Sequence, residues 1–154
     1  PVAIKLPGGA MISDGKEVKK DFGRLDQYEV TRKGSKVAVI GLGTFYGLGK
    51  EVAEELKKVT GTDATVINPY YITGIDAELL EELKKDHDVV ITLEDGILDG
   101  GFGEKIARFY GDSDMKVLNF GLKKEFLDRY DVAEVLKENH LTKEQIVKDV
   151  KNVL

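Results

Sequence analysis

The chain has 154 residues and no cysteine. Without a thiol it cannot form a disulfide, bind zinc through thiolates or use a cysteine as a nucleophile. It also lacks an apolar run close to the roughly 18 residues that a membrane-spanning helix needs, and no signal-peptide pattern opens the sequence. We therefore predict a cytoplasmic protein without a membrane partner. Because the sequence begins at Pro1 and not at a methionine, we expect that it has been trimmed.

The sequence also has fewer basic than acidic residues. The chain has 23 lysines and arginines against 28 aspartates and glutamates, which gives a formal net charge of −5. An acidic chain without a basic stripe does not suit a nucleic-acid partner, because such binding depends on neutralising phosphates. The small basic cluster of Lys123, Lys124 and Arg129 is accompanied by Glu125 and Asp128, and we interpret it as solvated surface.

The apolar pattern predicts alternating strands and helices in one domain. Hydrophobic residues make up 42% of the chain and charged residues 33%, which is typical of a soluble globular protein. Apolar runs predict strands at residues 28–32, 36–42, 64–68, 89–93 and 116–120. Helical spacing and capping residues predict helices at residues 48–59, 76–83 and 102–110, with two more after Asp131 and Thr142.

This order of elements predicts an α/β fold with parallel neighbouring strands and right-handed crossovers. We expect a three-layer α/β/α sandwich around a mostly parallel five-stranded sheet with one antiparallel edge strand. A two-residue turn at Lys33-Gly34 would pair the strand at 28–32 with the strand that follows it. Residues 1–26 lack periodicity, so we expect a linker there, with one short strand at Val2–Lys5, before the domain at 27–154.

The first glycine-rich joint is Gly41-Leu42-Gly43-Thr44-Phe45-Tyr46-Gly47, which lies between a predicted strand and a predicted helix. A dinucleotide site needs that context, because amides at a helix start can bind a pyrophosphate. The spacing is nevertheless G-x-G-x-x-x-G, and Asn68-Pro69 stands where an acidic residue is expected. We favour a tight strand-to-helix turn, and a free-standing nucleotide-binding module using Gly41, Gly43 and Gly47 is the alternative.

The second joint runs from Glu94 to Gly103. Glu94 and Asp95 stand at the carboxyl end of the strand at 89–93, and Gly100, Gly101, Phe102 and Gly103 open the next helix. Ligands of open α/β sheets gather beyond the carboxyl ends of strands. These six residues are therefore candidates for an interface or for a site where an anion regulates the protein. Glycine also serves close packing of a helix on a sheet or on a partner chain, and we favour that interpretation.

Other catalytic or metal-binding groupings are not supported by the sequence. Glu94, Asp95 and Asp99 lack the register of a calcium loop. His87 precedes its strand, at the edge away from the usual position of α/β sites, and His140 follows a helix end. Neither histidine has an orienting partner nearby in the sequence, so we predict no catalytic residue and no metal ligand in this chain.

Several motifs, taken in order, resemble one family. They are Val37–Gly43 with Thr44, Ile67-Asn68-Pro69, Asp76 with Leu79-Leu80, His87 through Gly96, Gly100 through Gly103, and Gly121 with Phe126. Together they resemble the C-terminal domain shared by 1-deoxy-D-xylulose-5-phosphate synthase, transketolase and the β chains of 2-oxo acid dehydrogenases. The synthase branch is the most similar, and the resemblance extends over nearly the whole chain.

The resemblance implies a supporting role in a larger thiamin diphosphate-dependent transferase. In that family one domain binds the cofactor diphosphate and magnesium, a second supplies the activating glutamate, and the third braces both and completes the dimer. The Gly-Asp-Gly…Asn motif of the first domain is absent from this sequence. We therefore expect a domain that binds no cofactor, is inactive alone, and works as a homodimer with the other domains or subunit of its parent enzyme.

One position departs from the family pattern. In the synthase branch an arginine just before this domain helps to hold the substrate phosphate, and Gly8 occupies the matching position here. Glycine cannot make the bidentate contact that a guanidinium makes with phosphate. This departure favours a transketolase-like parent with a different acceptor over synthesis of deoxyxylulose phosphate.

Overall fold

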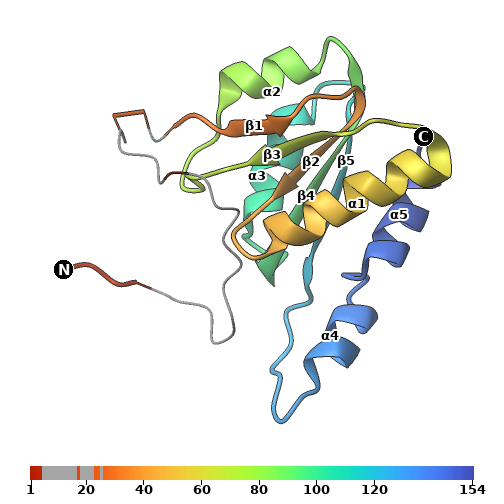
Figure 1. Ribbon diagram of the computed structural model, residues 1–154. Coiled ribbons are helices and arrows are strands. Elements are labelled where there is room, and N and C mark those ends of the chain that lie inside the picture. Colours follow the sequence, from red (N-terminus) through yellow and green to blue (C-terminus); the bar gives the residue numbers. More distant parts are fainter. Residues whose placement is uncertain (5–16, 18–22, 25) are drawn as a thin grey trace.

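The computed structural model describes residues 1–4, 17, 23–24 and 26–154 (Figure 1). Its described strands form one sheet in the order β1-β3-β2-β4-β5. The strands are β1 (Glu29–Arg32), β2 (Lys36–Gly41), β3 (Thr65–Asn68), β4 (His87–Ile97) and β5 (Lys116–Leu122). The helices are α1 (Phe45–Thr60), α2 (Ala77–Leu83), α3 (Phe102–Tyr110), α4 (Val132–Glu138) and α5 (Lys143–Lys151).

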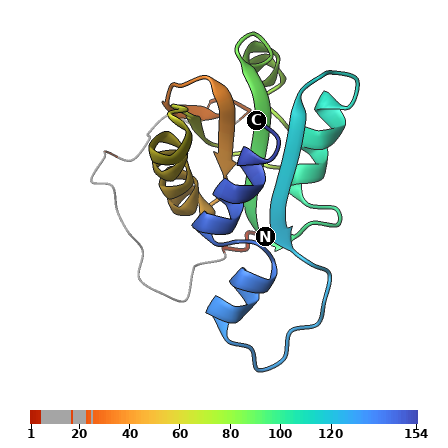
Figure 2. The same ribbon diagram turned by 90° about the vertical axis from the view of Figure 1, so that its right-hand side faces the viewer.

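The predicted architecture is confirmed. β2 pairs in parallel with β3 and β4, β4 pairs in parallel with β5, and only β1 is antiparallel to its neighbour among the described strands. Helices α1 and α5 cover one face of the sheet, and α2 and α3 cover the other (Figures 1 and 2). The two C-terminal helices begin as expected, since Asp131 accepts from the Glu134 amide and Thr142 from the Gln145 amide.

The predicted partner of the edge strand was wrong. β1 pairs with β3, with Glu29 opposite Asn68, and not with β2. Both edges of β2 pair with parallel strands, and helices on the two faces of the sheet bury its apolar residues. Gly34 carries the chain across the start of β3, where a Cβ atom would lie 1.8 Å from the Asp63 carbonyl oxygen. Burial of β2 at the centre of the sheet therefore overrides the local preference for a hairpin.

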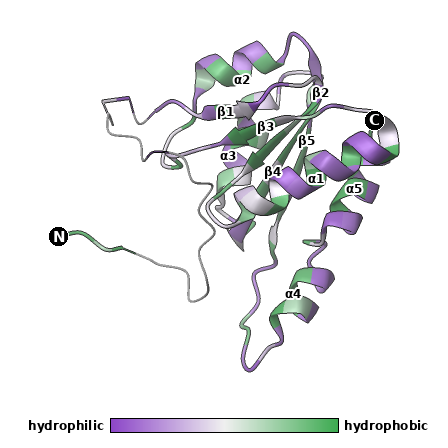
Figure 3. Cartoon of the chain, in the orientation of Figure 1, coloured by the Kyte–Doolittle hydropathy of each residue, from purple (hydrophilic) through white to green (hydrophobic). Residues whose placement is uncertain are grey.

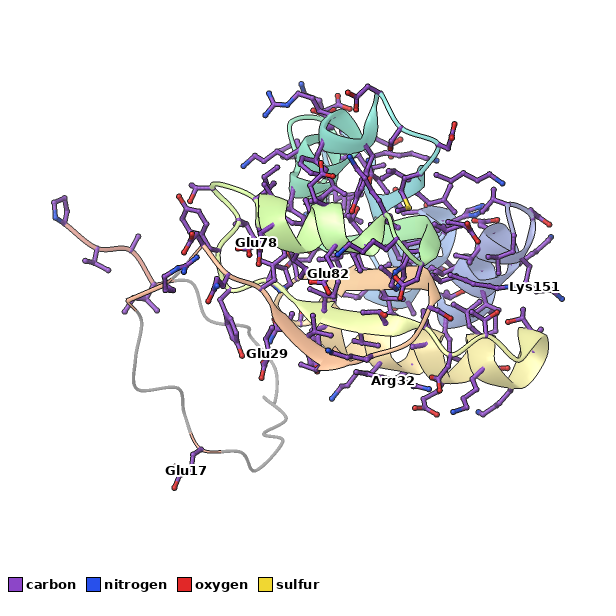
Figure 4. All side chains as sticks on the ribbon, turned by 90° about the horizontal axis from the view of Figure 1, so that it is seen from above. Glu17, Glu29, Arg32, Glu78, Glu82 and Lys151 are labelled. Atoms are coloured by element: carbon purple, nitrogen blue, oxygen red, sulfur yellow. The ribbon has the colours of Figure 1, made fainter. Side chains whose placement is uncertain are left out.

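Successive side chains of a strand point to opposite faces of the sheet and so belong to different core clusters. On β4, Val89, Ile91 and Leu93 belong to the cluster packed with α1 and α5, and Val90 belongs to the cluster packed with α2 and α3. Figure 3 shows apolar strands between helices whose outer sides are polar. Exposed charged residues on those outer sides include Glu78 and Glu82 of α2 and Lys151 of α5 (Figure 4).

The carboxyl ends of β2, β3, β4 and β5 meet at one edge, which we call the carboxyl edge. Helices α1, α2 and α3 begin there, and α4 with its preceding loop lies beyond it (Figure 2). The chain also enters the domain at this edge, because β1 is antiparallel and its first residue, Glu29, pairs with the last residue of β3. The Tyr28 amide donates to the Asp76 carboxyl group at 2.9 Å, which fixes the entry point.

The N-terminal segment differs from expectation. Val2–Ile4, the described part of the strand expected at Val2–Lys5, has no regular structure. Lys5 and Gly8 lie outside the described residues, so the linker and the departure at Gly8 stay predictions. In the described part of the chain, no helix combines the length and the apolar character needed to cross a bilayer.

Candidate functional site

The joint between β4 and α3 is built around Glu94. β4 extends past its predicted end at Leu93, and the Glu94 side chain is buried, with 5% of the residue exposed. One carboxyl oxygen, Oε2, accepts from the Phe102 amide at 3.0 Å, and Oε1 accepts from the Gly103 amide at 2.9 Å. Glu94 therefore satisfies two of the amides that the start of α3 leaves without a helical partner.

Strand alternation explains why Glu94 reaches this helix. Val90, Thr92 and Glu94 point to the same face of β4, which is the face covered by α3. The Gly101 amide donates to the Leu98 carbonyl at 2.9 Å, and Gly100 adopts a φ of 72°, so the chain turns back over the strand end. A carboxyl group suits this position because the N-terminus of a helix carries partial positive charge.

The glycines of this joint serve packing inside the domain. A Cβ atom on Gly101 would lie 2.8 Å from both Glu94 carboxyl oxygens. One on Gly103 would lie 2.6 Å from Thr92 Oγ1 and from Asn119 Cγ. The first turn of α3 can therefore contact the carboxyl ends of β4 and β5 only because these positions have no side chain.

The six candidate residues of the joint divide into two groups. Glu94, Phe102 and Gly103 are buried, and Phe102 packs on Tyr28 with 6.1 Å between ring centroids. Gly101 is partly exposed, whereas Asp95 and Gly100 are exposed. A partner chain would thus meet mainly Asp95 and Gly100. An external anion at the start of α3 would compete with Glu94 for the Phe102 and Gly103 amides.

At the first glycine joint, between β2 and α1, the first amides of the helix donate to backbone carbonyls of the turn and not to a carboxyl group. The Phe45, Tyr46 and Gly47 amides donate to the carbonyls three residues before them, at 2.9, 3.2 and 3.3 Å. A Cβ atom on Gly41 would lie 2.7 Å from Tyr46 Cα, so this glycine is required by the tight turn. Gly43 has a φ of 51°. The amides that a nucleotide phosphate needs already have acceptors within the turn.

A backbone hydrogen bond also joins the carboxyl ends of β2 and β4. The chain runs from β2 to β3 on one side and returns to β4 on the other, which makes this the switch point where ligands of such sheets usually bind. The Leu42 amide donates to the Leu93 carbonyl at 2.9 Å across it. Backbone hydrogen bonding thus continues to the point where a ligand would enter.

The expectation that neither histidine has a partner nearby in the sequence was wrong for His87, because its Nδ1 lies 2.6 Å from a carboxyl oxygen of the adjacent Asp86. His87 is buried at the start of β4, with Nε2 2.8 Å from Thr65 Oγ1 and Nδ1 3.2 Å from the Leu83 carbonyl oxygen. His140 is exposed, and its Nδ1 lies 3.0 Å from an Asp149 carboxyl oxygen. Among the described residues, no three histidine or acidic side chains come together as a metal site would require.

Two buried tyrosines lie at the ends of α3: Tyr28 packs on its first residue, Phe102, and Tyr110 is its last residue. Burial raises the pKa of Tyr28 to about 12. Burial, with the nearby charge of Glu81, also raises the pKa of Tyr110, whose hydroxyl donates to the Leu80 carbonyl at 2.8 Å. These hydroxyls therefore stay protonated at neutral pH. The Tyr28 hydroxyl donates to the Gly74 carbonyl at 3.4 Å, so the two tyrosines join the residue before β1 and the end of α3 to α2 and the loop before it.

Thr92 and Asn119 were not singled out in the sequence, and Gly121 was named only as part of a family motif. Thr92 Oγ1 donates to Asn119 Oδ1 at 2.8 Å beneath Gly103. Gly121 lies at the end of β5, where a Cβ atom would be 2.9 Å from Leu98 Cδ2. The available signal was polarity, since Thr92 and Asn119 interrupt apolar strands. Their pairing depends on the register of β4 and β5, which the sequence does not display.

Comparison with known proteins assigns the family. Residues 26–146 match the family described as "Transketolase, C-terminal domain". The chain belongs to this family. The resemblance found in its motifs is thereby confirmed.

Curated synthase sequences are among the proteins similar to this chain. The chain is 33% identical over 158 residues to 1-deoxy-D-xylulose-5-phosphate synthase of Vibrio campbellii, and 31% identical over 156 residues to the synthase of Clostridium tetani. Each match covers 100% of this chain but only 24% and 25% of the relative. The chain therefore spans about a quarter of the length of these relatives.

Solved structures share the fold. A structure described as a split gene transketolase, an inactive β4 tetramer, has a TM-score of 0.75 at 24% identity, covering 85% of this chain and 43% of that chain. Transketolase from Campylobacter jejuni has a TM-score of 0.56 at 17% identity, covering 83% of this chain and 19% of that chain. These similarities show that the fold is that of a transketolase C-terminal domain.

Proposed function

We propose that this domain supports a thiamin diphosphate-dependent transferase of the transketolase or deoxyxylulose-phosphate synthase type, and that it holds no cofactor itself. The observation that carries the proposal is the use of Glu94. The acidic group best placed at the carboxyl edge caps α3 from a buried position, so it serves the fold and not a substrate. The family match and the quarter-length coverage of the relatives support a parent with further domains.

In this proposal the chemistry belongs to the other domains or subunit of a cytoplasmic parent enzyme. Those parts would bind thiamin diphosphate and magnesium and supply the activating glutamate. The present domain braces them and contributes to a homodimer. Asp95 and Gly100 are the residues of the β4–α3 joint that a second copy would contact, because they are exposed where the other candidates are wholly or partly buried.

The activity test uses the full-length enzyme or its reconstituted subunits, supplied with thiamin diphosphate and magnesium. Pyruvate and a ketose phosphate are offered as alternative donors, each with an aldose phosphate as the acceptor of the two-carbon group. We expect turnover of the ketose phosphate without decarboxylation of pyruvate, because Gly8 replaces the phosphate-holding arginine of the synthase branch. Decarboxylation of pyruvate would show a synthase despite Gly8, and inactivity with both donors would overturn the transferase proposal.

The dimer test needs a substitution that leaves the domain folded. A large side chain at Gly101 would collide with Glu94, so loss of dimer in such a variant would be uninformative. Asp95→Arg changes an exposed residue instead and should weaken the dimer in sedimentation velocity experiments. Asp112→Arg, which alters an exposed carboxylate after α3 at the opposite edge, is the matched control. Equal sedimentation of both variants and the parent would argue against an interface at this joint.

A further inference from the structure

Helix α4 is joined to α5 by a short turn that fixes where α4 lies. Only Val135 is buried among the residues of α4, and the helix lies beyond the carboxyl edge (Figure 2). At the turn, the Leu141 amide donates to the Leu136 carbonyl at 2.8 Å, and the His140 amide donates to the Lys137 carbonyl at 3.3 Å. These two bonds are those of a Schellman motif, which ends a helix. Because α4 buries little surface, the geometry of this turn decides its position.

His140 occupies the left-handed position of this turn. Its φ is 57°, in the region that glycine most often adopts at the end of a helix. The His140 side chain is 60% exposed, and its Nδ1 lies 3.0 Å from Oδ2 of Asp149 on α5. A histidine therefore stands where glycine would suit the backbone better, and its ring joins the end of α4 to α5 through a carboxylate.

Two attractions act on the His140 imidazole when it is protonated. The Asp149 carboxylate is within hydrogen-bond distance of the ring. His140 also directly follows the cap residue of α4, beside the last carbonyls of the helix, which carry partial negative charge. Asp149 benefits as well, because it lies near the C-terminus of α5, where an isolated negative charge is unfavourable. Protonation of the ring therefore strengthens the contact between the two helices.

The other charged side chains near the turn have less influence on His140. Among the described residues, Asp149 is the charged group that the His140 ring contacts. The remaining charges are exposed or partly exposed, so solvent and salt screen them. Most of them are lysines, which oppose protonation of the ring, and the direct contact with Asp149 outweighs them. They are Lys123 and Lys124 after β5, Asp131 before α4, Glu134, Lys137 and Glu138 of α4, and Lys143, Glu144, Lys148 and Lys151 of α5.

We propose that His140 and Asp149 form a pH-sensitive joint that holds α4 against α5 most firmly when the imidazole is protonated. Histidine is the side chain whose charge changes between about pH 5 and pH 8. At the acidic end of this range the contact joins opposite charges, whereas at the alkaline end it is a hydrogen bond from a neutral ring. Because the ring is exposed, it exchanges protons with solvent while the domain stays folded. The hold on α4 is therefore present in mild acid and weakens as the pH rises.

Hydrogen exchange of the α4 amides in the full-length protein tests this joint. The parent is compared with His140→Asn, because asparagine tolerates the left-handed conformation and donates a hydrogen bond but carries no charge. We expect the variant amides to exchange about 2- to 5-fold faster than those of the parent at about pH 5.5, as is typical of losing an exposed ion pair, and equally fast at about pH 8. Comparing the two proteins at one pH cancels the chemical dependence of exchange on pH, and His87 is present in both.

A second variant identifies the partner of the imidazole. Asp149→Asn should accelerate α4 exchange at the lower pH by a similar factor, and the double variant should exchange no faster than either single variant, because both side chains act through one contact. Lys148→Gln removes an exposed charge beside Asp149 and is the matched control. It should leave the difference in α4 exchange between the two pH values unchanged.

Two outcomes overturn the proposal. If His140→Asn changes α4 exchange by the same factor at both pH values, the charge of the ring does not hold the helix. If the effects of His140→Asn and Asp149→Asn add, the two side chains act separately and the joint does not exist. The measurement needs neither cofactor nor substrate, so its result is independent of the proposed transferase function.

Discussion

The two strand-to-helix joints of this domain look alike in sequence but start their helices in different ways. After β2, the first amides of α1 donate to carbonyls of the turn itself, and the cap residue Thr44 makes no side-chain hydrogen bond. After β4, the first amides of α3 donate to the carboxyl group of Glu94, which comes from the preceding strand. One joint is thus stabilised locally and the other through a buried side chain.

The difference shows why a glycine-rich turn before a helix does not by itself indicate a ligand site. The amides at a helix start are available to a phosphate only when the protein provides no acceptor of its own. Here both joints provide one, by different means.

The largest effect is expected from removing the carboxyl cap of α3. Glu94→Ala leaves the Phe102 and Gly103 amides without acceptors in a buried position. It should lower the free energy of unfolding by about 2–4 kcal/mol, since each unsatisfied buried donor costs about 1–3 kcal/mol. Urea denaturation followed by circular dichroism measures the change. Thr44→Ala at the other joint should cost less than about 0.5 kcal/mol, because its side chain caps nothing. Similar losses in both variants would remove the distinction between the joints.

The second prediction compares how closely the two helices approach the sheet. Gly103→Ala places a methyl group 2.6 Å from Thr92 Oγ1 and Asn119 Cγ. We expect a loss of about 1–3 kcal/mol in unfolding free energy, as is usual when a packed site is overfilled. The hydrogen bond between Thr92 and Asn119 should also be disturbed. If the variant has the same denaturation midpoint or the same crystal structure as the parent, the added methyl group is accommodated beside Thr92 and Asn119 without strain.

The third prediction concerns alkaline pH at the α3 joint, where Tyr28 packs on Phe102. Burial raises the pKa of Tyr28 from 10.0 to about 12, so the protonated form is favoured by folding. The stability that comes from keeping Tyr28 protonated in the folded state is present below pH 10 and is lost as the pH rises toward about 12. At about pH 11 the parent should have lost about 1 kcal/mol through this group. Between about pH 8 and pH 11, the Tyr28→Phe variant should lose less free energy of unfolding than the parent, as measured by urea denaturation. Equal losses in the two proteins would refute the assignment.

The smallest effect is a gain at the α1 joint. Gly47 lies in the first turn of α1, and nothing lies within 4 Å of the position of its missing Cβ atom. Gly47→Ala should stabilise the domain by about 0.5–1 kcal/mol, because alanine loses less backbone entropy on forming a helix. The sign is opposite to that expected for Gly103→Ala, although both glycines occupy first helical turns. A lower melting temperature for Gly47→Ala would show that this position also serves close approach.

Periodicity in the sequence was sufficient to predict the layers and most elements. The run at Val89–Leu93, the helical spacing of Phe102, Ile106 and Tyr110, and the capping boxes at Asp131 and Thr142 each reflect local physics that acts within a few residues. These signals located five strands and five helices, and the ordered motifs indicated the family. The sequence also indicated that Glu94 stands at the carboxyl edge, since its strand ends there.

Only the tertiary structure decided which groups meet. The hairpin expected at Lys33-Gly34 gave way to pairing of β1 with β3, because β2 is buried between two parallel strands. Glu94 could have bound a ligand or capped a helix, and the choice depended on a loop that returns α3 to it through Gly100 and Gly101. Local patterns fix which face a side chain takes, whereas long-range pairing fixes its partner, and that pairing gains its free energy from burial across the whole sheet.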